Sequence, residues 1–475
     1  MKHQLERVKP EQAGISSAGL GKFLDYIEDM NINLHSFMLL RYGHIAAEGY
    51  YKPFHRHLLH PIFSVSKSIT SAAVGIAIQE GLFSLQDRVI DFFQDKLAED
   101  VHPYTAMMQV KHLLSMQTVH PGSTDTQGED WVYSFLNTPP SYPPGTIFAY
   151  DTTATHTLCA IIQRTSGQTV LDYLRPRLFD PIGIGQIEWE SCPQQINKGG
   201  SGIWCTTEDM ARFGQLYLQD GIWDGKRILP KGWVERSTSK IVDNSNAKAL
   251  LDGRQGYGYQ FWRCRNDAYC AFGMGGQFIV VVPHKQIVFV TTANTLQNRD
   301  EHQLILNGFW EYIYAAAADE PVQDNPLQYR RLLKQIERLQ LVLPKSLDRA
   351  APAEETTKRK YILNSNPLGY TSCEITLGPT PELKFCTDQR RVTICSFSFD
   401  QPLIGTDPFF GFEAACGASW MDSQTMIVQM QLLNQMQMFL LTCRFEDHFL
   451  VIQVKPIGTM KCGHIDCVLI GNTQD

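Results

Sequence analysis

The sequence predicts an α+β fold: an antiparallel sheet flanked by helices, an all-helical subdomain, and a C-terminal antiparallel β domain. Three observations lead to this prediction. Strand-like segments occur near residues 36–50 and again near 277–293, a long helical stretch separates them, and short β-rich segments begin at residue 361. Because the two strand pairs flank the helical stretch, we expect them to form one sheet with helices packed on it.

Residues 36–50 are predicted to form a hairpin, because two strand-like halves flank a turn at Tyr42-Gly43. Residues 66–80 are small and apolar without a clear polar face, which is typical of a buried helix. Further helical segments are expected near residues 86–95, 108–115, 153–165, 168–177 and 206–219.

The later part of the chain divides at a change in composition near residues 318–321. Before it, residues 277–282 and 286–292 are predicted to be strands, and a helix is expected near 300–317. After it come a basic amphipathic helix over 327–341, a Pro- and charge-rich linker over 343–360, and β-rich runs separated by turn residues. We therefore expect three parts: a first domain at 1–318, a helix and linker at 319–360, and a β domain at 361–475.

Composition excludes several classes of protein. The 475 residues include 42 basic and 49 acidic side chains, a net charge of −7, whereas nucleic-acid-binding proteins normally present a basic face. Apolar residues make up 43% of the chain, which is enough for a sizeable core and argues against disorder. The sequence has neither a signal-peptide core at its start nor an apolar segment of membrane-spanning length, so we expect a cytoplasmic protein without a membrane partner. None of the twelve cysteines forms C-x-x-C, and we predict reduced thiols.

Ser64 and Lys67 form the motif that carries the chemistry. Residues three apart on a helix share one face, so the ammonium can reach the hydroxyl. The apolar helix behind them predicts dry surroundings, which lower the pKa of a lysine and let it act as a base. The same S-x-x-K spacing recurs in a polar stretch that we assign to solvent-exposed surface, at Ser237/Lys240 and Ser245/Lys248.

Further segments share the order and spacing of a known family. The Ser64–Lys67 motif is followed by Pro144-Gly145-Thr146, by Tyr150-Asp151-Thr152, and by Gly199-Gly200-Ser201-Gly202. In this respect residues 10–315 resemble the serine β-lactamase and penicillin-binding-protein-like superfamily, specifically its class C-like esterases, amidases and 6-aminohexanoate-oligomer hydrolases. The resemblance implies a β-lactamase/transpeptidase-like fold and an acyl-enzyme mechanism without a cofactor.

The resemblance also implies the roles of the reacting groups. Ser64 is the nucleophile, Lys67 activates it, and Tyr150 carries protons between nucleophile and leaving group. Because a nearby ammonium stabilises a phenolate, we expect the pKa of Tyr150 to lie well below its usual value near 10. In the family the second motif ends in an asparagine that contacts the substrate amide. Thr152 replaces it here, which predicts altered recognition of the substrate.

The family's third motif, Lys-Thr-Gly, has no lysine in this sequence. The best match is Met274-Gly275-Gly276, and Gln277 after it is expected to supply the second oxyanion-hole N–H beside that of Ser64. The family's lysine binds a substrate carboxylate, which a methionine cannot do. We therefore predict a small-molecule substrate, a neutral ester or amide, with weak or absent β-lactamase activity. Nothing in the sequence is expected to attract an anionic substrate.

Two alternatives remain open. The spacing His55-x-His57-x-x-His60 resembles a metal-binding motif of metallo-β-lactamases, although Leu59 takes the place of its aspartate, and it would indicate a metallohydrolase. Thr152 and Met274 could instead mark a β-lactamase fold that has become a non-catalytic binding or sensor protein. Of these readings the serine hydrolase is preferred, with no metal and no cofactor. A homodimer formed through the C-terminal domain is a further hypothesis.

Overall fold

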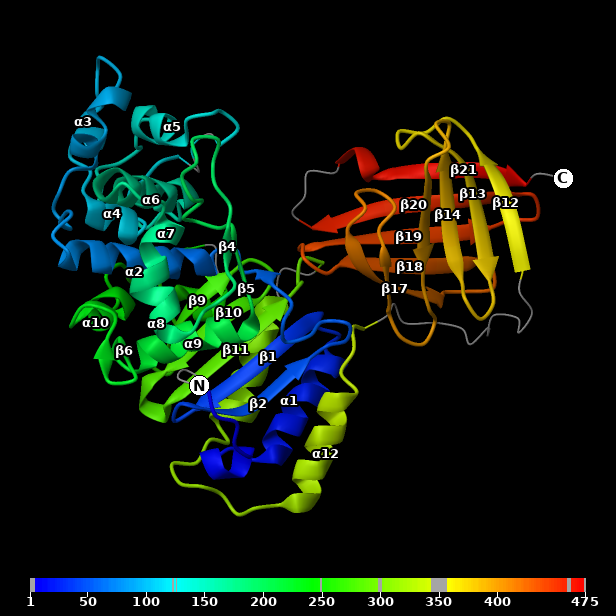
Figure 1. The fold of residues 1–475 in the computed structure, drawn as a ribbon, viewed down its shortest axis with the longest axis horizontal. Coiled ribbons are helices and arrows are strands. Elements are labelled where there is room, and N and C mark those ends of the chain that lie inside the picture. The colour runs from blue at the N-terminus through cyan, green and yellow to red at the C-terminus, as the bar shows by residue number, and fades with distance from the viewer. Residues whose placement is uncertain are drawn as a thin grey trace.

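The computed structural model describes residues 5–121, 124, 126–247, 250–297, 301–342, 357–458 and 463–473. They form an N-terminal α+β unit and a C-terminal β unit that lies beside it (Figure 1). The predicted fold class is thereby confirmed. Among the described residues, no helix is long and apolar enough to cross a lipid bilayer.

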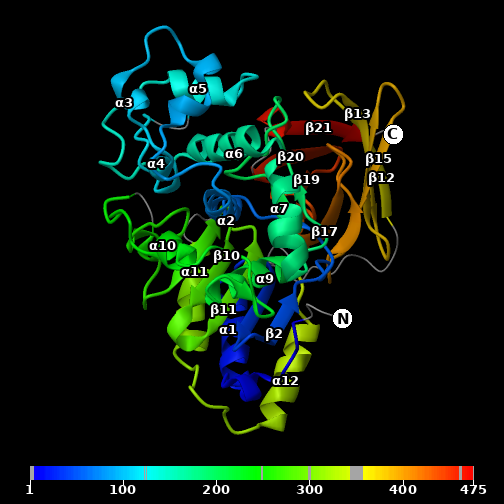
Figure 2. The same cartoon turned by 60° about the vertical axis from the view of Figure 1, so that its left-hand side comes forward.

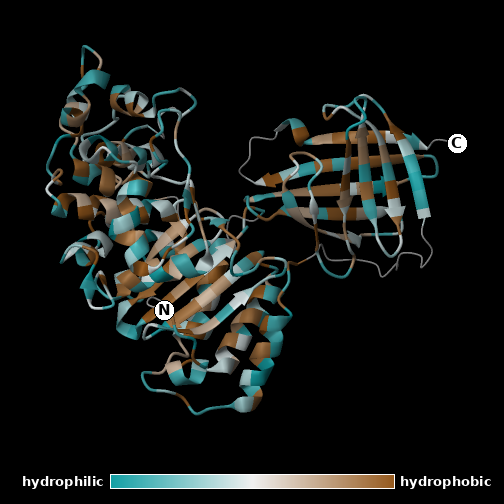
Figure 3. Ribbon diagram, in the orientation of Figure 1, coloured by the Kyte–Doolittle hydropathy of each residue, from teal (hydrophilic) through white to brown (hydrophobic). Residues whose placement is uncertain are grey.

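The N-terminal unit is built on a six-stranded antiparallel sheet, in the order β2-β1-β11-β10-β9-β8. The predicted hairpin and the later strand pair do share this sheet, because β1 pairs with β11 and Met38 lies opposite Val290. The strands of the sheet are apolar along most of their length (Figure 3). Their bounds are β1 Leu34–Arg41, β2 His44–Tyr50, β8 Trp262–Arg263, β9 Tyr269–Gly273, β10 Gln277–Val282 and β11 Ile287–Ala293.

Helices cover both faces of the sheet, since alternate side chains of a strand point to opposite faces. Ile279 and Val281 of β10 pack in the core that contains helices α2 (Val65–Gln79) and α9 (Thr207–Leu218). Phe278 and Val280 pack in the opposite core, with α1 (Ser17–Asp29) and α11 (Glu301–Gly308). Helix α12 (Pro326–Glu337) joins the second core and ends four residues before the predicted bound.

Small helices above the sheet form the predicted helical subdomain (Figure 1). Residues 86–95, predicted to be one helical segment, contain only two short 3₁₀ turns, Val89–Phe92 and Gln94–Lys96. The helices of this part are α3 Pro103–Ala106, α4 Val110–Leu114, α5 Trp131–Asn137, α6 Thr152–Ser166, α7 Val170–Leu174 and α8 Asp180–Ile182. Shorter elements complete the unit: β3 His60–Pro61, β4 Glu188–Trp189, β5 Ile203–Cys205, β6 Ile222–Trp223, β7 Lys226–Arg227 and α10 Trp233–Thr238.

The C-terminal unit is a ten-stranded antiparallel sheet that curls into a nearly closed barrel, in the order β15-β14-β13-β12-β21-β20-β19-β18-β17-β16. Near the gap the Ala418 N–H donates to the Ser398 carbonyl oxygen at 2.8 Å. The strands are β12 Thr357–Leu363, β13 Tyr370–Leu377, β14 Glu382–Thr387, β15 Val392–Ser396, β16 Leu403–Thr406, β17 Glu413–Trp420, β18 Thr425–Leu432, β19 Gln437–Phe445, β20 Phe449–Gly458 and β21 Cys467–Thr473.

The linker boundary and the cysteines of this region can be compared with the sequence predictions. Strand β12 begins at Thr357, so the last four residues assigned to the linker belong to the sheet, while residues 343–356 lie outside the described part. The barrel interior is filled by alternate side chains that include several cysteines, such as Cys395 and Cys416. Each of the eleven cysteines in the described ranges is a free thiol, as predicted.

Figure 2 shows the barrel beside the N-terminal unit from a second direction. The turn between β18 and β19 contacts that unit. Trp204 Nε1 donates to the carbonyl oxygen of Asn434 at 3.1 Å. The side-chain oxygen of Gln431 accepts hydrogen bonds from Asn33 Nδ2 at 3.3 Å and from Asn294 Nδ2 at 3.1 Å. These polar contacts hold the barrel against the edge of the N-terminal sheet where β9 and β10 turn.

Candidate active site

Ser64 lies at the start of α2, directly after a backbone strain point. Phe63 has a φ of 46°, in the left-handed region that bulky side chains avoid. Such strain persists only where the surrounding structure imposes it, and it is commonly found at functional sites. The Ser64 side chain is half-buried and lines a cavity, so the turn at Phe63 presents the hydroxyl to the space in which a substrate would bind.

Lys67 lies one turn further along α2 and is only 1% exposed. Its Nζ contacts Ser64 Oγ at 3.0 Å and Thr152 Oγ1 at 3.3 Å, and donates to the Gly200 carbonyl oxygen at 2.7 Å. Burial lowers the pKa of Lys67 to about 7, although the charge of Asp151 partly opposes this shift. A neutral amine keeps two N–H groups for Gly200 and Thr152 and directs its lone pair at the Ser64 hydroxyl.

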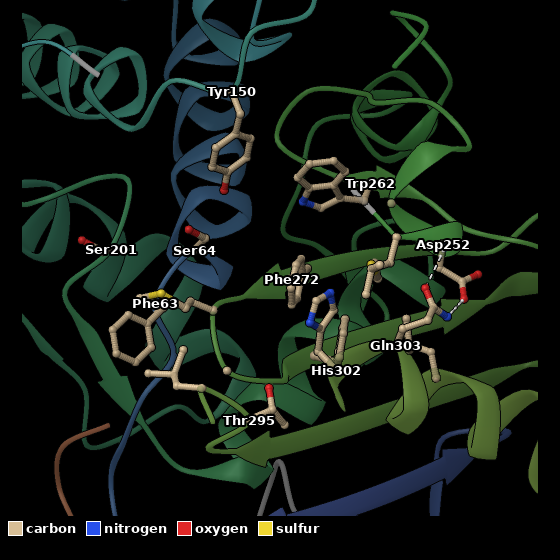
Figure 4. Close-up of a pocket in the computed structure, with 18 of the residues that line it drawn as sticks. Phe63, Ser64, Tyr150, Ser201, Asp252, Trp262, Phe272, Thr295, His302 and Gln303 are labelled. Atoms are coloured by element: carbon tan, nitrogen blue, oxygen red, sulfur yellow. Dashed lines mark hydrogen bonds between the residues drawn. The ribbon is translucent and has the colours of Figure 1, made fainter. Parts of the chain in front are cut away.

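Tyr150 lies on the other side of Ser64, and its hydroxyl points toward that residue (Figure 4). Its ring stacks on Trp262 with ring centres 5.4 Å apart, and 37% of the residue is open to the cavity. Lys67 Nζ lies 4.8 Å from the centre of the Tyr150 ring, over its face.

The pKa of Tyr150 differs from the sequence prediction. Burial among protein groups raises it above the usual value, and a hydrogen bond with Ser64 opposes the shift only in part. The expected lowering by Lys67 was wrong, because the lysine nitrogen lies over the ring and not against the phenol oxygen. Near neutral pH, Tyr150 is therefore a phenol that can donate a proton.

Asp151 fixes the start of α6, which carries Thr152 at its first position. Its carboxylate accepts from the backbone N–H groups of Thr153 and Ala154 and caps the helix. Burial opposes ionisation of Asp151, but hydrogen bonds from His120, Thr153 and Thr118 lower its pKa below the usual value. Sequence reasoning missed this role, although an aspartate directly before a helical run is a recognisable capping signal.

The glycine-rich turn after β9 borders the same cavity. Met274 is 43% exposed and Gly275 lines the cavity beside it. Gly275 and Gly276 have φ values of 81° and 92°, which a residue with a Cβ adopts only under strain. A Cβ on Gly275 would also overlap Sδ of Met436, which reaches the turn from the barrel.

The strand pairing of Gln277 bears on its predicted role as an oxyanion-hole donor. In antiparallel pairs the hydrogen-bonding groups of successive residues alternate in direction. The pairing of Phe278 with Thr291 of β11 therefore directs the main chain of Gln277 toward Gly273 of β9. The Gln277 side chain is buried, and its amide nitrogen donates to the carbonyl oxygens of Met274 and Ala293.

The same alternation identifies other N–H groups at the cavity. Trp262, the first residue of β8, lies opposite Cys270 of β9, so β8 does not extend beside the later residues of β9. The N–H of Phe272, two residues further along β9, therefore points past the end of β8, and that of Met274 continues the series. Phe272 and Met274 both line the cavity with Ser64.

The three histidines of the alternative metal motif do not converge. His60 is buried in β3 and stacks with His35, at 5.5 Å between ring centres, and burial lowers its pKa to about 3. His55 and His57 are exposed in the preceding loop. No cluster of three or more metal-ligating side chains occurs within the described ranges.

The other S-x-x-K pairs also differ from Ser64/Lys67. Lys240 is exposed, and its Nζ donates to Asp243 Oδ1 at 2.7 Å. Ser237 is buried at the end of α10, in contrast to its predicted surface position. Lys248 lies outside the described residues.

The cavity has a volume of about 1800 Å³ and is bounded by both units. Aromatic side chains form much of its wall on the N-terminal side, where Trp262 and Phe272 lie between Tyr150 and His302 (Figure 4). The barrel contributes residues from β19 and β20, namely Leu440, Lys455, Pro456, Ile457 and Gly458.

Comparison with known proteins identifies the family and the fold. The family model described as Beta-lactamase matches residues 33–307. A 6-aminohexanoate-dimer hydrolase from Paenarthrobacter ureafaciens is 28% identical over 287 residues, which cover 54% of this chain and 71% of that protein. The structure of EstCE1, a hydrolase with promiscuous acyltransferase activity, covers 62% of this chain and 99% of its own, with a TM-score of 0.52 at 15% identity.

A further structure resembles nearly the whole chain. The octameric penicillin-binding protein homologue from Pyrococcus abyssi covers 95% of this chain and 99% of its own, with a TM-score of 0.50 at 14% identity. At that identity the likeness concerns the fold alone. It shows that a sheet-and-helix unit followed by a β unit occurs in another protein.

Proposed function

The chain belongs to the beta-lactamase family, and we propose that it is a serine hydrolase that forms an acyl-enzyme on Ser64. The observation that carries this proposal is the contact between Lys67 Nζ and Ser64 Oγ at 3.0 Å, made by a buried lysine whose pKa is lowered to about 7. A lysine of this kind can take a proton from a serine at neutral pH.

The reaction would begin with attack of Ser64 Oγ on the substrate carbonyl. The hydroxyl proton passes to the neutral Lys67 amine, while the carbonyl oxygen becomes negative. The N–H of Ser64 is one donor for this oxyanion. The second is a main-chain N–H at the end of β9, that of Phe272 or of Met274. Each such donor is typically worth about 3–4 kcal/mol in the transition state.

Tyr150 would complete the first half of the reaction. Because its pKa is raised, it carries the proton that the leaving group needs. The phenol gives this proton to the departing nitrogen or oxygen. The Lys67 ammonium then passes the proton taken from Ser64 to the resulting phenolate, which restores both residues. Water then attacks the acyl-enzyme and gives one proton to the neutral Lys67 amine. Lys67 returns this proton to Ser64 Oγ as the bond to the acyl carbon breaks, which releases Ser64 and the acid.

The third motif bears on the substrate. Met274, which the sequence comparison places at the lysine position, offers no cation to bind a carboxylate next to the scissile bond. Ala271, which takes that position if the Met274 N–H follows the motif, offers none either. The group beside the scissile bond is therefore uncharged in the proposed substrate, an ester or a linear amide. The likeness to a 6-aminohexanoate-dimer hydrolase supports the amide, and weak or absent β-lactamase activity is expected.

A substrate panel tests the proposal. Wild type and Ser64→Ala are compared on p-nitrophenyl esters, amino-acid amides, linear aminohexanoate amides and a chromogenic cephalosporin. We expect Ser64-dependent turnover of an ester or linear amide and little of the cephalosporin. Fast Ser64-dependent cephalosporin turnover would contradict the argument from Met274. Failure of a fluorophosphonate probe to label Ser64 in folded protein would favour the non-catalytic binding protein instead.

A further inference from the structure

The barrel forms one wall of the cavity that contains Ser64, and it does so with its outer surface. Leu440 of β19 lies opposite Lys455 of β20. Their neighbours Leu441 and Val454 are buried in the barrel core, so Leu440 and Lys455 point outward. Both outward side chains line the cavity.

Contacts between the two units hold this wall in place. The bonds of Gln431 to Asn33 and Asn294 lie on one side of the β18–β19 turn. Met436 in the turn is 2% exposed and packs against Gly275. Because Leu440 and Lys455 lie on the strands next to this docked turn, their position relative to Ser64 is fixed by packing.

The charged residues of the cavity wall differ in whether they have an ion-pair partner. The charged residues among the described lining residues are Asp252, Arg254 and Lys455. Asp252 is buried and neutralised by Arg265, which binds both carboxylate oxygens at 3.1 and 2.9 Å. Arg254 and Lys455 are exposed to the cavity, and neither forms an ion pair with a residue in the described part of the chain.

We propose that Lys455 binds a carboxylate of the substrate at a position remote from the scissile bond. This inference rests on the proposed function and names the substrate class more narrowly: an ester or amide with a carboxylate at its far end. It departs from the expectation that nothing attracts an anionic substrate, since the proposed cation comes from the β domain and not from the third motif.

Two esters with the same six-carbon acyl chain test the proposal. Mono-p-nitrophenyl adipate ends in a carboxylate, whereas p-nitrophenyl hexanoate ends in a methyl group. The measured quantity is the ratio of kcat/KM for the first ester to that for the second. Because an exposed ion pair is worth up to about 1 kcal/mol, Lys455→Ala should lower this ratio about fivefold, and Lys455→Glu should lower it further.

Matched variants separate charge from packing. Lys455→Arg retains the cation and should keep the ratio near that of wild type. Lys360 is an exposed lysine of the same barrel, on β12 and outside the cavity, so Lys360→Ala should leave the ratio unchanged. Raising the salt concentration should lower the wild-type ratio, because salt screens exposed charges. A ratio that stays within twofold of wild type in both Lys455→Ala and Lys455→Glu would overturn the proposal.

A binding measurement distinguishes this failure from failure of the proposed function. If wild type hydrolyses neither ester, the carboxylate site is decided by calorimetry. The proposed serine hydrolase is wrong only if the esters and amides of the substrate panel are not hydrolysed either. The probes are the monoamide of adipic acid and hexanamide, each titrated into wild type and Lys455→Glu. Selective binding of the adipic monoamide that weakens in Lys455→Glu supports the site, and equal binding in both proteins refutes it.

Discussion

The side-chain nitrogen of Lys67 lies 3.0 Å from the hydroxyl oxygen of Ser64, within the protein and one helical turn away along α2. The helix supplies the spacing, and the apolar residues packed around it supply the dry surroundings. In bulk water a lysine would be protonated at neutral pH and could not accept the serine proton. Burial brings its pKa to about 7, where the free base is well populated.

The rate should follow the titration of Lys67. Because only the neutral amine accepts a proton, kcat/KM should rise about tenfold per pH unit below pH 7 and level off above about pH 8. No decline from Tyr150 is expected below pH 10, because burial raises its pKa. The check is a pH profile with a p-nitrophenyl ester, and a rate that does not change between pH 5.5 and 8 would argue against Lys67 as the base.

Lys67→Met should lose activity and gain stability. The folded pKa of about 7 lies below the usual lysine value of 10.5, so the buried amine destabilises the fold most fully below pH 7, and this penalty fades as the pH rises toward 10.5. We expect about a thousandfold lower kcat and about 2–3 kcal/mol more stability at pH 7, after allowing for the lost hydrogen bond to Gly200.

Denaturant titration of both proteins at pH 7 and pH 10 checks the stability of this variant. The difference between Lys67→Met and wild type should shrink at the higher pH. If Lys67→Met is less stable than wild type at both pH values, the buried amine does not destabilise the fold, in contrast to what its lowered pKa indicates.

Tyr150→Phe should distinguish good from poor leaving groups. The variant keeps the ring that stacks on Trp262 and removes the hydroxyl that faces Ser64. An amide nitrogen cannot depart without a proton, whereas p-nitrophenolate can. We expect kcat to fall about a hundredfold for a linear amide and only a few-fold for a p-nitrophenyl ester. Equal losses for both substrates would mean that Tyr150 positions the reacting groups and does not transfer a proton.

Gly275→Ala should destabilise the contact between the two units. An added Cβ is strained at a φ of 81° and overlaps Met436 Sδ. The expected loss is about 2–3 kcal/mol of unfolding free energy. Met436→Ala creates space for the methyl group, so the double variant should lose less than the sum of the two single changes, which a double-mutant cycle by urea titration measures. Additive losses would mean that the two residues do not press on one another.

Removal of metal should not change the activity. His60 stacks in the core while His55 and His57 are exposed, so the three side chains do not present a common ligand set. Incubation with EDTA followed by an ester assay checks this. Loss of activity that zinc restores, together with an active Ser64→Ala variant, would establish the metallohydrolase reading in place of the serine hydrolase.

The fold and the central residues could be predicted because their signals are local. The spacing of Ser64 and Lys67 follows from helix geometry, and the apolar run behind them predicts a buried helix, which α2 is. Short apolar runs likewise predicted β1, β10 and β11. Residues 86–95 were harder, because short 3₁₀ turns have the same spacing of apolar residues as a short helix.

The rest depends on contacts between distant parts of the chain. The direction of the Gln277 N–H is set by pairing with β9 and β11, and a shift of one residue in motif alignment reverses it. The pKa of Tyr150 depends on where Lys67 Nζ lies relative to the ring, which spacing alone does not give. No motif identifies Lys455, because this residue joins the cavity that contains Ser64 only when the barrel docks.

Because the two units share one cavity, residues of the β unit can influence which substrate fits. Leu440 and Lys455 lie on strands that take no part in bond cleavage, yet they border the space in which the substrate lies. Under the proposed function, mutations on the outer face of β19 and β20 would alter selectivity while the proposed nucleophile, base and proton donor remain unchanged. A mutant library confined to that face would vary the substrate preference without changing the residues at Ser64. Exchanging the whole barrel between homologues would transfer the substrate preference of one protein to the other.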